Sequence, residues 1–344
     1  MRGPLRPGVL IGGALGLGAL GYAGALGWAR RPASAKVSEP ELEALIRERL
    51  ERSGACGQHL YLGTRWGRIH ALETGRRGDW VLFLHGLGAS AASYSQLLAE
   101  LSHTHRVLAV DLPGAGLSDP VRFTGHPRAP WVDVISEVAA ARSLGRFHLV
   151  GHSMGGLAAG AYAVERPDSV ASLVMLAPVG LAESPPLTWL AASIPGLADL
   201  TAALDRGAME RQWARGDADV RGLPGGPVEV GPDPDGYRLQ VSRRFAGGSD
   251  MNAFARLLGP LGFHPDSHLL PGLGVIAGRV TVVFGADDRK VEPAAAQAQL
   301  AHYPGIELRV IPGWGHLFPF LQPELTAEVL KVAFTKSPSS AGAA

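Results

Sequence analysis

Ser153 lies in the part of the sequence whose residue types most clearly suggest chemistry. It is the third residue of Gly-His-Ser-Met-Gly-Gly at 151–156, which follows an apolar run at 146–150 and precedes a run at 157–166 rich in helix formers. These runs predict a strand and a helix, and a serine between glycines at a strand-to-helix turn is the setting of a nucleophile. The glycines remove clashes in the turn, and N–H groups at the helix start stay free to face a negative charge. We therefore predict a nucleophilic serine; the alternative is an ordinary glycine-rich turn.

A glycine-rich loop at 85–88 follows a run at 79–84 that predicts a buried strand. In open α/β sheets, binding sites form at the carboxyl ends of the strands. We expect the backbone N–H groups of Leu87 and Met154 to be the two donors that stabilise an oxyanion. His85 is expected to brace this loop rather than to transfer a proton.

A third polar loop, at 111–119, follows a predicted strand at 106–110 and contains a proline and two glycines that indicate a sharp turn. Asp111 and Asp119 are expected to hydrogen-bond the backbone of this loop, because aspartate favours such local bonds. A direct catalytic role for either carboxylate is the lesser alternative. The Gly-Ala-Gly at 114–116 is too short a match to indicate a dinucleotide site.

The composition excludes several classes of function. The chain has 344 residues and a formal net charge of +1, so no basic excess indicates a nucleic-acid partner. Cys56 is the only cysteine, which excludes an intrachain disulfide and any zinc site built from a cysteine cluster. The length suffices for one large domain, or for a domain with an insertion.

The N-terminus contains a separate apolar segment. About 21 residues without a charge, Gly8 to Trp28, lie between basic residues on both sides. A membrane-spanning helix needs about 20 such residues, so we expect a single-pass N-terminal membrane anchor. The alternatives are a signal peptide cleaved near Ala33–Ala35, which would give a secreted protein, and a segment that is buried or unstructured in water. Because basic residues flank the segment at both ends, the sequence does not determine on which side of the membrane the rest of the chain lies.

The motifs at 85–88, 111–119 and 151–156 together resemble the α/β-hydrolase superfamily. They are similar to its serine hydrolase branch, which holds esterases, monoglyceride lipases, C–C bond hydrolases and cofactor-free haloperoxidases. The resemblance covers roughly residues 60–180 and 275–335. It implies an α/β-hydrolase fold, with a mostly parallel central sheet, helices on both faces and an inserted helical cap.

The resemblance also implies which residues accompany the serine. The family's acid loop follows a late strand, and its aspartate stands three residues after a glycine, which selects Asp288 in Gly-Ala-Asp-Asp at 285–288. Asp287 is the alternative, and Glu183 is a more distant one. The family's base lies in a loop after the last strand, where Pro-Gly-Trp-Gly precedes His316.

Composition shifts and the resemblance divide the chain into six segments. An amphipathic helix is expected to begin near Glu39, and it would lie on the domain or on a membrane surface. The expected segments are an anchor or signal at 1–35, a tether with the amphipathic helix at 36–58, the first part of the hydrolase core at 59–180, the cap at 181–275, the second part of the core at 276–336, and a disordered tail at 337–344.

The expected function is hydrolysis of carboxylic esters, lipid-like esters among them, through an acyl-enzyme. His316 would take the proton of Ser153, and Asp288 would hold the imidazole in the required tautomer. No metal or organic cofactor is required. The alternatives are a C–C bond hydrolase or a cofactor-free haloperoxidase with the same three residues, and a non-catalytic binding protein on the same scaffold. The strand-to-helix turn around Ser153, here called the elbow, needs Gly151 and Gly155. The loop at 85–88 that contains Leu87, here called the oxyanion loop, needs Gly86 and Gly88.

Overall fold

The structure is a computed structural model. It describes residues 21, 24–25, 39–86, 89–119, 128–181 and 269–335. The expected anchor at 8–28 and the expected cap at 181–275 therefore lie almost wholly outside the described residues. Among the helices that the structure does describe, none combines the length and the apolar character that a membrane crossing requires.

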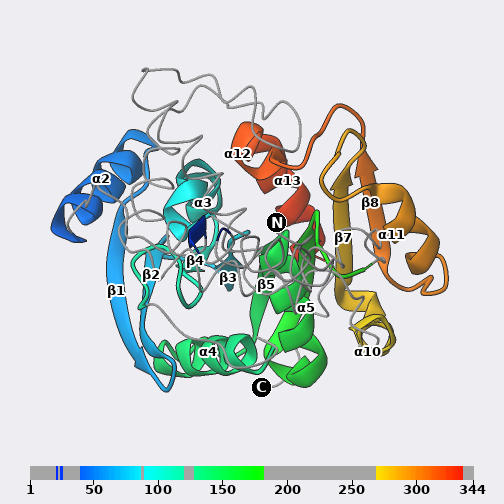
Figure 1. The fold of residues 1–344 in the computed structure, drawn as a ribbon, viewed down its shortest axis with the longest axis horizontal. Helices are drawn as coiled ribbons and strands as arrows, with labels where there is room; N and C mark the ends of the chain where they lie inside the picture. Colours follow the sequence, from blue (N-terminus) through cyan, green and yellow to red (C-terminus); the bar gives the residue numbers. More distant parts are fainter. Residues whose placement is uncertain are drawn as a thin grey trace, which may run out of the picture.

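The described residues form one sheet of eight strands, in the order β1-β2-β4-β3-β5-β6-β7-β8. The pair β1–β2 is antiparallel, as is the pair β2–β4, and the strands from β4 to β8 are parallel (Figure 1). The mostly parallel sheet expected from the sequence is thus confirmed. The strands are β1 (Gly57–Thr64), β2 (Gly67–Thr74), β3 (Trp80–Leu84), β4 (Arg106–Val110), β5 (Phe147–His152), β6 (Val170–Leu176), β7 (Val280–Gly285) and β8 (Glu307–Ile311).

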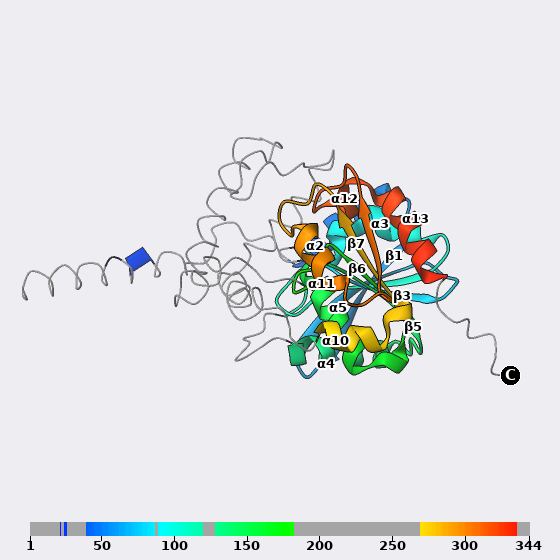
Figure 2. The ribbon, with the colours of Figure 1, turned by 90° about the vertical axis from the view of Figure 1, so that its right-hand side faces the viewer.

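Helices cover both faces of the sheet (Figure 2). On one face α3 packs against α13, with α12 beside them, and on the other face α5 packs against α4 and α10. The helices are α2 (Glu39–Arg52), α3 (Ser95–Ser102), α4 (Arg128–Ala141), α5 (Met154–Glu165), α10 (Leu269–Val275), α11 (Pro293–Leu300), α12 (Phe318–Leu321) and α13 (Pro323–Phe334), with short 3₁₀ turns η1 (Ala91–Tyr94), η2 (Pro167–Ser169) and η3 (Ala277–Arg279).

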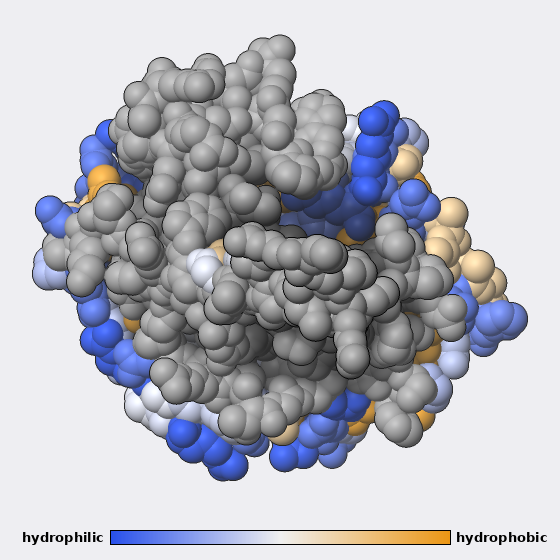
Figure 3. All heavy atoms as spheres, viewed as in Figure 1, coloured by the Kyte–Doolittle hydropathy of each residue, from blue (hydrophilic) through white to orange (hydrophobic). Residues whose placement is uncertain are grey.

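The central strands are buried along their whole length. Every residue of β3, β5 and β7 is buried, as expected for parallel strands covered by helices on both faces. Because both faces of these strands are buried, their sequences are continuous apolar runs and do not alternate between polar and apolar residues. On the face drawn in Figure 3, the described residues visible around the rim are mainly hydrophilic.

The amphipathic helix expected near Glu39 is α2, and it lies on the domain. Leu42, Ile46 and Leu50 are buried against the core, and burial of each such side chain contributes about 1.5–3 kcal/mol. The guanidinium of Arg49 donates a hydrogen bond of 2.6 Å to the hydroxyl of Ser95 in α3. The helix is therefore part of the packed domain.

The parallel strands bring four loops to one edge of the sheet. Because β3, β5, β7 and β8 run in the same direction, the loops that follow them begin at the same edge. These loops carry the residues whose chemistry the sequence singles out.

Candidate active site

Ser153 occupies a strained turn between β5 and α5. Its backbone angles are φ 53° and ψ −115°, a region that residues other than glycine rarely adopt. Its N–H donates to the carbonyl of Leu176 at 2.8 Å. Although Ser153 is the N-cap residue of α5, its hydroxyl does not cap the helix. The hydroxyl oxygen lies 3.2 Å from Nε2 of His316 instead.

Two glycines make this turn possible. A Cβ atom on Gly151 would lie 2.1 Å from the carbonyl oxygen of Gly155, and one on Gly155 would lie 2.4 Å from the carbonyl oxygen of Leu84. Both distances are far below van der Waals contact, and the atoms that a methyl group would meet belong to the backbone. The start of α5 can approach β3 and β5 only because neither position carries a side chain.

Gly155→Ala is therefore expected to destabilise the protein by more than about 3 kcal/mol, because backbone cannot move aside as a side chain can. Gly63→Ala is the matched control, since a Cβ there would meet nothing within 4 Å. Thermal unfolding of both variants checks the expectation. A Gly155→Ala protein that unfolds at the temperature of the control would contradict it.

His316 lies between Ser153 and a buried carboxylate. Its Nδ1 is 2.8 Å from Oδ2 of Asp288, whose Oδ1 accepts hydrogen bonds from the backbone N–H groups of Lys290 and Val291 at 2.8 and 2.9 Å. Asp288 is 3% exposed. Since the carboxylate can only accept, Nδ1 of His316 carries the proton and Nε2 presents its lone pair to Ser153. This is the geometry that a general base needs.

The neighbouring Asp287 is exposed and makes a different contact. Its backbone N–H donates to the carbonyl of Trp314 at 2.9 Å. The structure thus brings Asp288, the carboxylate that the glycine rule selects, to His316. The third candidate, Glu183, lies outside the described residues.

The two expected oxyanion donors differ in how far the structure describes them. Met154 is the first residue of α5, so its N–H has no acceptor within the helix. Leu87 and Gly88 lie outside the described residues. Gly86 packs tightly against the elbow, because a Cβ there would lie 3.0 Å from Nδ1 of His152 and 3.2 Å from Cβ of Ser153.

His85 braces the loop, as expected. Its Nε2 accepts the N–H of Leu112 at 3.0 Å, so Nδ1 carries the proton and donates to the carbonyl of Gly86 at 2.8 Å. Burial lowers the pKa of His85, which keeps the ring neutral. The side chain therefore ties the loop after β3 to the loop after β4.

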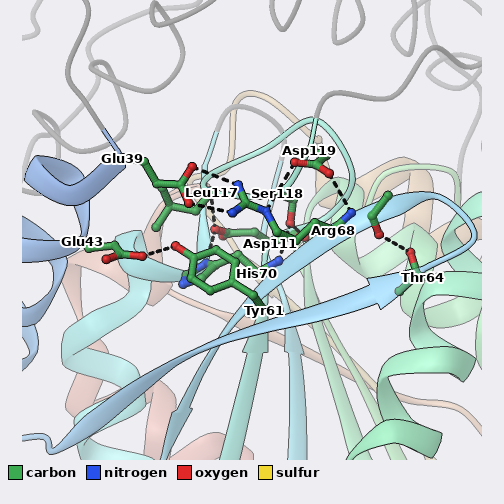
Figure 4. A network of polar contacts seen from close by, with 11 residues as sticks. Glu39, Glu43, Tyr61, Thr64, Arg68, His70, Asp111, Leu117, Ser118 and Asp119 are labelled. Carbon is green, nitrogen blue, oxygen red and sulfur yellow. Dashed lines mark hydrogen bonds and ion pairs between the residues drawn. The ribbon is translucent and has the colours of Figure 1, made fainter.

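Asp111 is the centre of a buried network (Figure 4). Its Oδ1 accepts the N–H of Ala91 at 2.7 Å, while its Oδ2 accepts that of Leu117 at 2.9 Å and lies 2.7 Å from Nδ1 of His70. The expectation that Asp111 binds the backbone of its own loop is confirmed. His70, which is fully buried, is a partner that sequence reasoning missed.

The side chain of Asp119 turns away from its own loop, contrary to expectation. Its Oδ2 accepts the N–H of Arg68 at 2.8 Å, and the guanidinium of Arg68 pairs with both carboxylate oxygens of Glu39 at 2.9 Å (Figure 4). The reason is that β2 lies antiparallel beside β4, so the loop after β4 folds back onto the start of β2. The loop is thereby tied to α2.

A comparison with known families agrees with this arrangement. Residues 81–329, well over half of the chain, match the model of the Alpha/beta hydrolase family. The chain belongs to the alpha/beta hydrolase family. The eight-stranded, mostly parallel sheet of the described residues agrees with that assignment.

One curated relative of this hydrolase is a 2-hydroxy-6-oxononadienedioate/2-hydroxy-6-oxononatrienedioate hydrolase from Burkholderia vietnamiensis. The two are 34% identical over 113 residues, which is 32% of this chain and 39% of the relative. For five curated relatives, this one included, the match covers only between 24% and 39% of the relative's length.

Two solved structures show the same fold as this hydrolase. Carboxylesterase CesB (YbfK) from Bacillus subtilis has a TM-score of 0.63 and 20% identity, and the match covers 86% of this chain and 96% of that one. A membrane phospholipase A described as a bacterial virulence factor has a TM-score of 0.64 and 22% identity, with 96% and 98% of the chains covered.

Sequence reasoning about this alpha/beta hydrolase missed one further residue beside the site. The hydroxyl of Tyr94 accepts the N–H of Gly86 at 3.0 Å and lies 2.7 Å from Nδ1 of His152. His152 directly precedes Ser153 in the chain. No pattern around Tyr94 signals its contact, because its partner His152 stands 58 positions away in the sequence.

Proposed function

We propose that this hydrolase cleaves carboxylic esters through an acyl-enzyme formed on Ser153. The observation that carries the proposal is the continuous hydrogen-bonded series from Asp288 through His316 to the hydroxyl of Ser153. A serine hydroxyl is a weak nucleophile near neutral pH, so a base within hydrogen-bond reach is required. No metal or organic cofactor is needed for this chemistry.

The reaction proceeds in two halves. Nε2 of His316 takes the proton as Ser153 attacks the ester carbonyl, and the developing oxyanion is held by the N–H groups of Met154 and Leu87. His316 then returns the proton to the departing alkoxide, leaving the acyl group on Ser153. A water molecule, deprotonated by His316, then attacks the acyl-enzyme. His316 returns that proton to the oxygen of Ser153 as the acid leaves, which restores the free serine. Asp288 stabilises the imidazolium in both halves.

A lipid-like ester held at a membrane surface is the substrate class that we propose. The uncharged run at 8–28 is long enough for an anchor, and one structural neighbour is named a membrane phospholipase A. If full-length protein with an intact N-terminus is recovered from a salt-washed soluble fraction, the anchor is ruled out.

A C–C bond hydrolase is the second candidate. The relative from Burkholderia vietnamiensis, at 34% identity over 113 residues, favours it. The same three residues serve both reactions, so the choice between them depends on what the site binds.

Labelling with a fluorophosphonate probe tests the proposal. We expect stoichiometric attachment of the probe to Ser153, located by mass spectrometry of the digested protein, because the probe reacts with serines that have an activating base. A panel of p-nitrophenyl esters of graded chain length, with a vinylogous 1,5-diketone acid beside them, then separates ester from C–C cleavage. Absence of both labelling and turnover would overturn the proposal.

A further inference from the structure

Two buried side chains connect the loop after β3 to the loop that carries His316. Tyr94 and His152 are 1% and 2% exposed. The hydroxyl of Tyr94 lies 3.0 Å from the backbone nitrogen of Gly86 and 2.7 Å from Nδ1 of His152. Nε2 of His152 lies 2.9 Å from the backbone carbonyl oxygen of His316.

The position of every proton in this series follows from chemistry. The carbonyl of His316 can only accept, so Nε2 of His152 carries a proton and donates it. Burial, and then the nearby His316, lower the pKa of His152 well below its ordinary value, so the ring is neutral and Nδ1 is an acceptor. Tyr94 therefore donates its O–H to Nδ1 of His152 and accepts the N–H of Gly86. The series has one direction, from Gly86 to His316.

Packing leaves these rings little freedom. The Tyr94 ring lies 4.5 Å from that of Phe83 and 4.4 Å from that of Phe320, and the rings of His152 and His316 are 5.0 Å apart, all measured between centroids. Because buried hydrogen-bonding groups are costly to leave unpaired, a shift of either loop would cost the free energy of a broken hydrogen bond in this series.

We propose that Tyr94 and His152 are positioning residues that hold the oxyanion loop and His316 in a fixed relation to Ser153. This inference rests on the proposed function. Gly86 directly precedes Leu87, the expected oxyanion donor, and the carbonyl that His152 holds belongs to the expected base. Acyl transfer needs the donor and the base placed correctly at the same moment, and an error of about 1 Å in such a placement can cost on the order of 100-fold in rate.

Tyr94→Phe and His152→Leu are expected to lower kcat by about 10-fold to 100-fold while KM changes less than about twofold. Neither side chain is exposed, so uniform binding of substrate is retained and the loss falls on the chemical step. His152→Gln is expected to recover part of kcat, because its amide N–H can still donate to the carbonyl of His316. A residue with only a structural role would not give this division between kcat and KM.

Two matched controls separate positioning from stability. Tyr162 is 3% exposed and its hydroxyl accepts from Ser169 at 3.0 Å. His148 is 4% exposed, lies on the same strand as His152, and its Nδ1 is 2.8 Å from the hydroxyl of Ser172. Tyr162→Phe and His148→Gln are expected to lower the melting temperature as Tyr94→Phe and His152→Gln do, with kcat unchanged.

The kinetics of the variants and of the unmodified protein distinguish failure of the positioning role from failure of the proposed function. If Tyr94→Phe and His152→Leu keep the kcat of the controls while the unmodified protein is active, the positioning role is overturned and the proposed function stands. If the unmodified protein neither reacts with a fluorophosphonate nor turns over esters, the proposed function fails, and the positioning role fails with it.

A second measurement does not depend on activity or on any variant folding with full stability. The ¹⁵N chemical shifts of the His152 ring in the unmodified protein report its tautomer, and the signals are assigned by their absence in His152→Gln. We expect a neutral ring protonated on Nε2 at pH 7. A ring protonated on Nδ1, or on both nitrogens, would overturn the direction of the series.

Discussion

Replacing Ser153 with alanine is expected to lower kcat for ester hydrolysis by about six orders of magnitude, the scale of loss that follows removal of a catalytic serine. Without the Ser153 hydroxyl there is no nucleophile for His316 to deprotonate, so the orientation of His316 by Asp288 no longer contributes to the rate. The fold should be retained, because the side-chain oxygen of Ser153 makes no helix-capping hydrogen bond. Kinetics with a p-nitrophenyl ester, beside thermal unfolding, check both parts. Alanine protein that hydrolyses esters at the original rate would remove Ser153 from the mechanism.

A glycine variant at the same position separates the chemistry from the strain of the turn. Ser153 has φ 53°, which costs a non-glycine residue about 1–3 kcal/mol, whereas glycine adopts positive φ freely. After the greater entropy that glycine loses on folding, Ser153→Gly should be about 1 kcal/mol more stable than Ser153→Ala and equally inactive. The serine is thus kept at a position where its presence lowers stability.

The strands and the order of the site residues could be predicted from the sequence because each depends on local pattern. The apolar runs of β3, β5 and β7 end in polar or glycine-rich loops, and parallel strands bring those loops to one edge. The choice of Asp288 over Asp287 came from the spacing after Gly285, and only Asp288 lies within hydrogen-bond distance of His316.

The partners of buried side chains could not be predicted, because they depend on packing between distant segments. Tyr94 contacts Gly86 and His152 only because η1 turns its ring between Phe83 and Phe320. Such contacts have no fixed sequence spacing, and the same holds for Asp119.

Replacing Asp288 with asparagine is expected to lower kcat by about four orders of magnitude. The carboxylate's Oδ1 is fixed by the N–H groups of Lys290 and Val291 at 2.8 and 2.9 Å. Asparagine must place its only acceptor oxygen there, so its NH₂ group faces Nδ1 of His316. Nδ1 would then have to accept, which moves the ring proton to Nε2 and leaves no lone pair for the hydroxyl of Ser153.

Asp287→Asn is the matched control for that variant, since it makes the same change of charge one residue away. The Asp287 side chain is exposed, and its hydrogen bond to Trp314 uses the backbone N–H, which the substitution leaves in place. We expect its kcat to stay within about twofold of the original, as is usual for an exposed side chain outside the site. Because both variants lose one negative charge at the same edge of the sheet, a general electrostatic effect would lower both rates alike. Loss of the required tautomer, in contrast, lowers kcat in Asp288→Asn and leaves it unchanged in Asp287→Asn. A larger loss of kcat in Asp287→Asn would show that Asp287, and not Asp288, is the acid.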